Sequence, residues 1–150
     1  MRKTPRPSRP VDHEPVDHEL VDHELVDHEL VEAAARVVRE HASGEEHTVA
    51  AAGRTDDGRV VTALNVHHFT GGPCAELVVI GAAAAQGARS LTAIVAVGGD
   101  GRDILPPCGR CRQVLLDCYP AVEVIVDDGR PRSVPVTDLL PGAYVNAEHQ

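Results

Sequence analysis

Aromatic side chains are nearly absent from this chain of 150 residues, which has one Phe, two Tyr and no Trp. Proteins that bind single-stranded nucleic acids stack the bases on aromatic rings, and this sequence offers almost no such rings. The formal net charge of −9 also lacks the basic excess that binding to a phosphate backbone requires. Both absences argue against a nucleic-acid partner and favour a small molecule.

Long apolar runs are missing as well. No stretch is long enough to predict a transmembrane helix, and the N-terminus lacks the apolar segment of a secretory signal. Cysteine is limited to four residues, and three of them have a spacing that is typical of metal ligands. We therefore expect a cytoplasmic protein with reduced thiols and no membrane partner.

The first 30 residues have low complexity. Residues 1–10 are rich in Arg and Pro, and a five-residue unit, VDHEP followed by three copies of VDHEL, fills residues 11–30. On a helix this period advances by about 140° per unit, so the histidines would spiral around the axis. The pattern favours a low-complexity extension over a metal-binding tract of His13, His18, His23 and His28. We expect residues 1–20 to be a disordered extension and residues 21–150 to form one domain.

Helical and strand patterns alternate through the rest of the chain. Apolar residues at helical spacing predict a first helix, and two strands joined by a Thr-Asp-Asp-Gly turn follow it. Further helices then alternate with apolar strands, which predicts an α/β fold: a three-layer α/β/α sandwich with a mixed sheet of about five strands. The predicted strands cover residues 48–53, 59–66, 91–97, 122–126 and 133–136, the predicted helices cover residues 22–41, 74–86, 108–119 and 137–140, and a loop covers residues 98–105.

Three cysteines carry the clearest chemical signal. Cys108 and Cys111 form a Cys-x-x-Cys pair at the start of a predicted helix, and Cys74 at the start of the preceding helix is the candidate third ligand. A zinc ion with three protein ligands keeps one position for water, which is typical of a catalytic site. Glu76 follows Cys74 too closely to be a further ligand, but it can reach that water. The sequence predicts one Zn²⁺ per chain.

Other interpretations of these residues remain open. The cysteines could be buried thiols, a redox pair or half of a structural zinc knuckle. A knuckle needs a fourth ligand, and Cys118 lies about two to three helical turns from Cys108, so we expect Cys118 in the core. Glu76 could instead complement the dipole of a helix N-terminus. Arg110 and Arg112 could offset the charge of three thiolates or lie on an exposed helix surface.

The motifs CAE at residues 74–76 and PCGRC at residues 107–111 resemble those of the cytidine deaminase family of zinc hydrolases. Two longer runs, HFTGGPCAELVV from His68 and CGRCRQVLLD from Cys108, resemble more closely the blasticidin-S deaminases within that family. The resemblance covers about residues 31–145 and implies hydrolytic deamination of a cytosine ring in a nucleoside. It also implies a homotetramer, with Glu76 as the proton shuttle and with zinc bound by Cys74, Cys108 and Cys111.

The resemblance further implies substrate contacts at Thr48, Asn65, Arg102 and Tyr144. Ordinary cytidine deaminases have Asn-x-Glu at the ribose and an Arg after the catalytic Glu, whereas this chain has NVH at residues 65–67 and Leu77. Loss of the ribose carboxylate should weaken cytidine binding. Arg102 could bind the carboxylate that blasticidin S carries on its sugar, or it could be an exposed loop arginine.

Three functions therefore remain open. The one we favour is an antibiotic-inactivating deaminase that acts on blasticidin S or a related aminonucleoside. The second is a cytidine or deoxycytidine deaminase of pyrimidine salvage, and the third is a zinc-stabilised binding protein without turnover. Parallel assays of the two substrates separate the first two functions, and a Glu76→Gln variant separates the first from the third.

Overall fold

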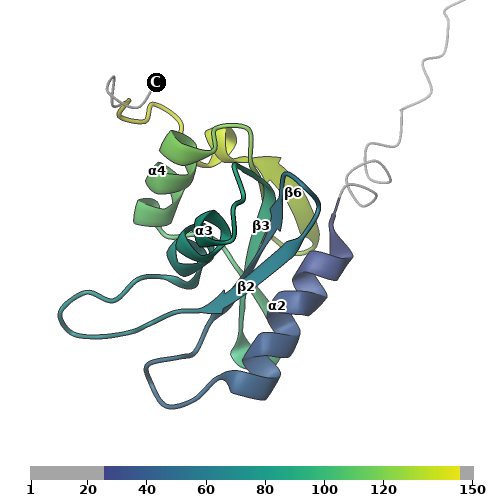
Figure 1. Ribbon diagram of the computed structural model, residues 1–150, viewed down its shortest axis with the longest axis vertical. Helices are drawn as coiled ribbons and strands as arrows, with labels where there is room; N and C mark the ends of the chain where they lie inside the picture. Colours follow the sequence, from purple (N-terminus) through teal and green to yellow (C-terminus); the bar gives the residue numbers. More distant parts are fainter. Residues whose placement is uncertain (1–25, 146–150) are drawn as a thin grey trace, which may run out of the picture.

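The computed structural model describes residues 26–145, which form a mixed sheet with helices on both faces (Figure 1). Helix α2 (His28–His41) covers one face, and helices α3 (Ala75–Ala85) and α4 (Gly109–Cys118) lie on the other. This arrangement confirms the predicted three-layer α/β/α sandwich. None of the helices within residues 26–145 is long and apolar enough to cross a bilayer.

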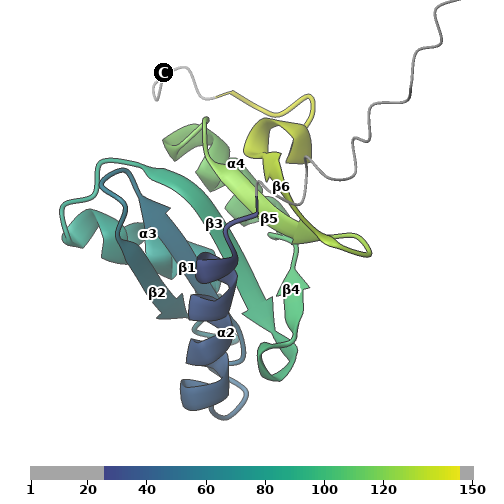
Figure 2. The same ribbon diagram turned by 90° about the vertical axis from the view of Figure 1, so that its right-hand side faces the viewer.

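Six strands make up the sheet, one more than predicted. They are β1 (Ala50–Thr55), β2 (Val60–Leu64), β3 (Leu91–Gly98), β4 (Asp103–Leu105), β5 (Glu123–Asp127) and β6 (Pro131–Pro135). The order is β2-β1-β3-β5-β6, and β4 pairs with the end of β3 (Figure 2). Among the described strands, β3 and β5 are the one parallel pair. These are the two strands that the sequence marks by nearly continuous apolar runs, because both of their faces are covered.

Strand β4 and a short 3-10 helix, η1 (Gly99–Gly101), replace the loop predicted over residues 98–105. Residues 96–98 of β3 pair with residues 103–105 in antiparallel register. The chain reverses through three consecutive residues with positive φ, namely Gly99 at 55°, Asp100 at 59° and Gly101 at 84°. A strand of three residues is too short to show the apolar/polar alternation that predicts strands. It can be recognised only from its pairing with a neighbouring strand. The prediction of a loop was wrong for this reason.

The start of α2 also differs from the prediction. Residues 22–25 of the predicted helix lie outside the described residues, but Val26 and Asp27 are described and are not helical. Asp27 is the N-cap, and its carboxylate accepts a hydrogen bond of 3.1 Å from the backbone N–H of Leu30. Arg54 on β1 donates to the same carboxylate at 2.8 and 3.0 Å, which holds the pKa of Asp27 below its usual value. The helix therefore starts where its cap is fixed to the sheet.

Two apolar clusters hold the layers together. On the α2 face, Val26 and Leu30 are buried against Val95 of β3 and Ile125 of β5. On the opposite face, alternate residues of the same strands pack against α3 and α4, in a cluster that includes Val79, Ile94, Leu115 and Val124. The last copy of the five-residue unit, residues 26–30, thus contributes to the core of the described domain.

The prediction that Cys118 lies in the core was wrong, since its side chain is exposed. Helix α4 contributes Leu115 to the core cluster, and the next core residue along the chain is Val122, which follows the helix. Cys118 is the last residue of α4, and the adjacent Tyr119 packs against the core cluster in its place. The apolar helical pattern therefore correctly predicted that Leu115 is buried, but it wrongly predicted burial in the last turn of the helix.

Removing residues 1–15 is expected to leave the melting temperature of the protein unchanged. These residues lie outside the described part of the chain, and the described core contacts begin at Val26, just before α2. Thermal unfolding of the shortened and full-length chains, monitored by circular dichroism, tests this expectation. A melting temperature lower by several degrees would mean that the extension packs on the domain, and the predicted boundary after residue 20 would then be wrong.

Candidate metal centre and active site

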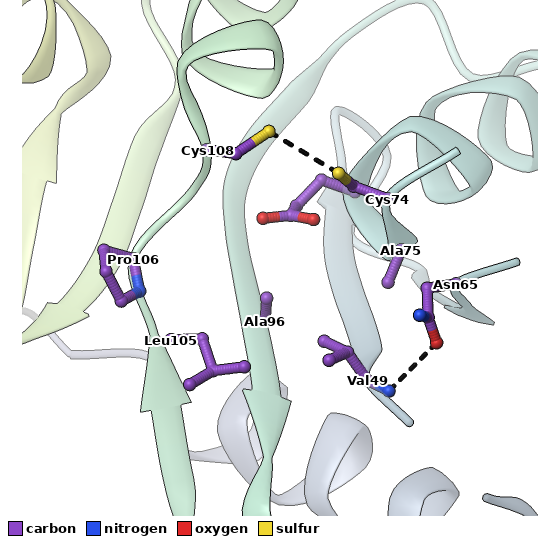
Figure 3. A pocket seen from close by; sticks show the side chains of 9 residues that line it. Val49, Asn65, Cys74, Ala75, Ala96, Leu105, Pro106 and Cys108 are labelled. Carbon is purple, nitrogen blue, oxygen red and sulfur yellow. Dashed lines mark hydrogen bonds between the residues drawn. The ribbon is translucent and has the colours of Figure 1, made fainter. Parts of the chain in front are cut away.

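The predicted zinc ligands lie at the N-terminal ends of two neighbouring helices. Cys74 is the N-cap of α3, Cys108 is the N-cap of α4, and Cys111 lies in the first turn of α4. The side chains of Cys74 and Cys108 point toward each other from these two ends (Figure 3). Free backbone N–H groups and the positive end of the helix dipole favour thiolates at such positions.

The three sulfur atoms are close enough to bind one metal ion. The Sγ atoms of Cys74 and Cys108 are 3.5 Å apart, and all three Sγ atoms lie within 4.8 Å of one another. Tetrahedral zinc with Zn–S bonds of about 2.3 Å requires sulfur–sulfur distances of about 3.8 Å. The cluster is therefore compatible with one zinc ion. Within residues 26–145 no fourth His, Cys, Asp or Glu belongs to it, which leaves a position for water.

The thiols differ in their electrostatic surroundings. Burial raises the pKa of Cys111, and the nearby carboxylate of Glu76 raises it further. Burial also acts to raise the pKa of Cys108, but hydrogen bonds from the backbone N–H of Cys111 and from the neighbouring thiols outweigh it, so this pKa is lowered. Since zinc binds thiolates, the buried Cys111 needs the metal charge most in order to lose its proton.

Of the two nearby cations, Arg110 lies at the thiols and Arg112 does not. The Arg110 guanidinium donates to the carbonyl of Gly72 at 3.0 Å and lies 3.9 Å from the Sγ of Cys74. The Arg112 guanidinium donates instead to the carbonyls of Pro107 and Leu139, at 2.8 and 2.9 Å. Arg112 thus ties the start of α4 to the C-terminal segment, and Arg110 can offset thiolate charge.

Glu76 is buried in the first turn of α3, with a relative exposure of 6%. Burial raises the pKa of its carboxyl group, and hydrogen bonds from its own backbone N–H and from Cys111 partly oppose this shift. A carboxylate that only complements a helix dipole is most stable when exposed to solvent. The burial of Glu76 beside the thiols is therefore better explained by a chemical role than by the dipole alone.

A pocket of about 170 Å³ opens beside these groups. Cys74, Glu76, Cys108 and Asn65 are among the residues that line it. The Asn65 side-chain oxygen accepts hydrogen bonds from the backbone N–H groups of Thr48 and Val49, at 2.8 and 3.0 Å. The oxygen is thus occupied. One amide N–H donates to the hydroxyl of Thr48 at 3.5 Å, so the other N–H remains as a donor toward a ligand. The pocket volume suits a single heterocyclic ring.

Apolar walls of this pocket were not predicted from the sequence. They come from the residue before β1, from β3 and β4 and from the segment before α4, and include Val49, Ala96, Leu105 and Pro106 (Figure 3). No local pattern distinguishes these residues from other core residues. The proline pair before Cys108 is the one signal that could have pointed to a rigid entry into the site.

The other predicted substrate contacts do not line this pocket. Thr48 lies next to Asn65, but it lines a different hollow, at the end of α2. Arg102 follows η1 with 79% of its side chain exposed, and it forms an ion pair with Asp100 at 3.6 Å. Tyr144 is 76% exposed, and its backbone carbonyl accepts from the side chain of Gln113. The substrate roles of these residues remain predictions.

Arg110→Gln is expected to weaken zinc binding about tenfold, because a cation beside the thiolates is lost. The test is a titration with a zinc-binding dye, in which the variant should release its metal at a lower dye concentration. Arg132→Gln removes an equal charge from an exposed ion pair on β6 and serves as the control. If both variants hold zinc as tightly as the unmodified chain, Arg110 does not stabilise the metal centre.

Comparison with known proteins agrees with this geometry. The family model described as "Cytidine and deoxycytidylate deaminase zinc-binding region" matches residues 25–126. A cytidine deaminase of Mycobacterium tuberculosis is 46% identical over 99 residues, which cover 64% of this chain and 71% of that protein. A blasticidin-S deaminase of Bacillus cereus is 30% identical over 109 residues, which cover 66% of this chain and 78% of that protein.

Solved structures show the same fold. The crystal structure of cytidine deaminase from Mycobacterium tuberculosis has a TM-score of 0.66 and 37% identity, and the match covers 81% of this chain and 99% of that one. The enzyme from Mycobacterium leprae has a TM-score of 0.67 and 32% identity, with 77% of this chain and 98% of that one covered.

Proposed function

Because the chain belongs to the cytidine and deoxycytidylate deaminase family, we propose that it deaminates the cytosine ring of an aminonucleoside, with blasticidin S as its preferred substrate. Family membership makes the protein a zinc-dependent deaminase, and the choice of substrate is the proposal. The observation that carries the chemistry is the buried carboxylate of Glu76 in one pocket with Cys74 and Cys108.

Zinc held by Cys74, Cys108 and Cys111 would act as a Lewis acid that makes a water nucleophilic near neutral pH. The Glu76 carboxylate takes one proton from this water and delivers it to the ring nitrogen as the new C–O bond forms. It then takes the second proton, from the resulting hydroxyl, and delivers it to the departing amine. The C–N bond breaks, ammonia leaves, and a carbonyl replaces the amine. A single carboxylate can serve both steps, since it is regenerated at the end of the cycle.

The pocket walls orient the base for this reaction. Ala96, Leu105 and Pro106 offer apolar surface to the faces of the ring. The Asn65 amide can donate to an oxygen of the sugar, because its own oxygen is already bonded to Thr48 and Val49. Exclusion of bulk water by these walls strengthens the polar contacts in the site.

The choice between blasticidin S and cytidine depends on the sugar end of the site. The NVH motif at residues 65–67 offers His67 where ordinary cytidine deaminases have a ribose-binding carboxylate. This difference favours a sugar without the usual ribose hydroxyl contacts, as in blasticidin S. Cytidine is the second candidate, because the relative at 46% identity is a cytidine deaminase and the blasticidin-S deaminase reaches 30%.

Parallel assays of the purified zinc protein on the two substrates test the proposal. We expect kcat/KM for blasticidin S to exceed that for cytidine, with ammonia released in proportion to the change in ultraviolet absorbance. If cytidine is the better substrate, the protein is a cytidine deaminase and the antibiotic assignment is wrong. If neither nucleoside is deaminated, the non-catalytic binding function replaces both.

Arg102→Ala is expected to lower kcat/KM for blasticidin S about tenfold and to lower that for cytidine much less. Arg102 has an exposed guanidinium that could pair with the sugar carboxylate of blasticidin S, and cytidine has no such group. Steady-state kinetics on both substrates provide the measurement. Equal losses on the two substrates would mean that Arg102 does not bind the carboxylate of blasticidin S.

Tyr144, the other exposed residue of the predicted set, is proposed to pack near the bound substrate.

The remaining proposals concern the whole protein. On its family resemblance we propose a cytoplasmic homotetramer whose domain follows a low-complexity extension of about residues 1–20. Size-exclusion chromatography with light scattering tests the assembly. A monomeric mass at micromolar concentration would contradict it.

A further inference from the structure

The direction of the Asn65 side chain in the zinc pocket is set just beyond the end of β2. Apart from the thiols, Asn65 is the one uncharged polar side chain among the residues that line the pocket. Its oxygen accepts from the backbone N–H groups of Thr48 and Val49, and one N–H of its amide donates to the Thr48 hydroxyl. One amide N–H is left for the sugar of a bound nucleoside, so its direction depends on what maintains these three bonds.

The antiparallel pairing of β1 and β2 continues past their ends, but one backbone bond is exchanged. Asn65 donates its backbone N–H to the carbonyl of Val49 at 2.9 Å. In a regular antiparallel ladder the residues of such a pair exchange both backbone bonds, so Val49 would donate back to the carbonyl of Asn65. Here the N–H of Val49 donates instead to the side-chain oxygen of Asn65, at 3.0 Å (Figure 3). The backbone carbonyl of Asn65 thereby loses its ladder partner.

The imidazole of His47 takes the place of that ladder partner. Its Nδ1 lies 2.7 Å from the backbone oxygen of Asn65. A carbonyl oxygen only accepts hydrogen bonds, so Nδ1 carries a proton, as it does in the charged imidazole and in one neutral tautomer. His47 is half-buried, and its own backbone is fixed by two hydrogen bonds with Ser43, of 3.0 and 3.2 Å. The turn that follows α2 therefore holds this donor in place.

One extra residue in the register accompanies the contact. The N–H of Asn65 pairs with the carbonyl of Val49, and two residues further the N–H of His67 donates at 2.8 Å. Its acceptor is the carbonyl of Glu46, three residues before Val49. Two steps along one segment thus match three along the other, which is the register of a β-bulge. Bulges re-aim side chains and are frequent beside active sites, and this one lies on the segment that carries His47.

The backbone beside Asn65 is also tied to the metal centre. The N–H of Val66 donates to the carbonyl of Pro73 at 3.0 Å, and Pro73 directly precedes the zinc ligand Cys74. Gly72 packs so closely against this contact that a Cβ on it would collide with the carbonyl of Val66. The backbone is therefore fixed relative to the thiols, and what remains to be set is the direction of the Asn65 side chain.

We infer that His47 is a positioning residue for the nucleoside contact of Asn65. His47 bonds to the backbone carbonyl and so keeps the N–H of Val49 for the side-chain oxygen. Without this donor the carbonyl would return to the ladder with Val49, because a backbone carbonyl at this depth needs a partner. The Asn65 amide would then lose one of the bonds that orient it. The inference rests on the proposed function, since it concerns the contact of Asn65 with the sugar of a nucleoside substrate.

His47→Leu tests the inference, because leucine has a similar size and no hydrogen-bond donor. We expect the KM of the nucleoside substrate to rise about tenfold, while kcat and the zinc content stay nearly unchanged. His47→Asn should keep the KM within about threefold of that of the unmodified chain, because its amide can donate from nearly the position of Nδ1. His41→Leu, at the exposed end of α2, is the matched control and should change neither constant.

A spectrum provides a readout that does not depend on turnover. The chain has two asparagines, Asn65 and Asn146, so ¹⁵N labelling of asparagine gives two pairs of side-chain amide signals in a nuclear magnetic resonance spectrum. The pair that disappears in Asn65→Ala belongs to Asn65. We expect this pair to shift in His47→Leu and to keep its position in His41→Leu.

Either an unchanged KM or unchanged Asn65 signals in His47→Leu would overturn the inference. A His47→Asn variant as impaired as His47→Leu would also overturn it, because the donor would then not be what matters. If the unmodified protein deaminates neither nucleoside, the proposed function fails, and the amide signals alone decide the role of His47. If His47→Leu does not fold, His47→Asp takes its place beside His47→Asn, since of these two only asparagine keeps a donor.

Discussion

Glu76→Gln is expected to reduce kcat for deamination by about a hundredfold or more while one zinc per chain stays bound. Glutamine keeps the size and polarity of the side chain but cannot take a proton from water and return it to the departing amine. The variant should fold normally, because a neutral amide is easier to bury than a carboxylate in a site with a relative exposure of 6%. Rates should be measured on both nucleosides, and zinc by elemental analysis.

Two results would contradict this role for Glu76. A variant that retains most of its activity would show that another group moves the proton. A variant that loses its zinc along with its activity would show that Glu76 supports the metal instead. Glu123→Gln, at the start of β5 and away from the pocket, is the matched control and should leave both quantities unchanged. Loss of turnover with zinc retained would also exclude a purely structural zinc.

Cys111→Ala is expected to abolish zinc binding and activity together. Cys111 is the fully buried member of the three thiols, and two thiolates alone give zinc an incomplete set of ligands. Loss of the metal should also lower the melting temperature, because zinc binds the folded chain and stabilises it by mass action. Elemental analysis and thermal unfolding of the purified variant, with and without added zinc, provide the measurements.

Cys118→Ser is the control for this experiment. Cys118 is exposed and lies outside the group of three sulfurs, so its replacement should keep the zinc content and the melting temperature of the unmodified chain. Unchanged zinc in Cys111→Ala would contradict the predicted ligand set. Loss of zinc in Cys118→Ser would point to a metal site other than the one described.

The metal centre could be predicted from the sequence because its geometry is local. The Cys-x-x-Cys spacing turns two sulfurs to one side at the start of a helix, and Cys74 stands at the start of the preceding helix. Only the proximity of the N-termini of α3 and α4 depends on the tertiary fold. The alternation of helices and strands along the sequence already implied that proximity. The same alternation accounts for the correct prediction of the three layers.

Features that depend on packing between distant segments could not be predicted in this way. Residues 103–105 form strand β4 because they pair with β3, and this pairing closes the turn in which Asp100 has a positive φ. The exposure of Cys118 depends on how α4 is rotated against its neighbours, which brings Leu115 and Tyr119 to the core and leaves Cys118 outside. The separation of Arg102 and Tyr144 from the zinc pocket follows likewise from the path of loops whose sequence has no periodicity.

The anchoring of α2 at residues 26–30 has a consequence for how the gene of this protein can change. The two copies of VDHEL that precede residues 26–30 are identical to them, so gain or loss of a whole unit still leaves VDHEL at the edge of the domain. Asp27 would be replaced by an identical N-cap, and Arg54 would meet the same carboxylate. Replication slippage that adds or removes a whole unit of this repeat would therefore leave the folded structure unchanged. We expect closely related genes to differ here by complete units, with the sequence from the last copy onward unchanged.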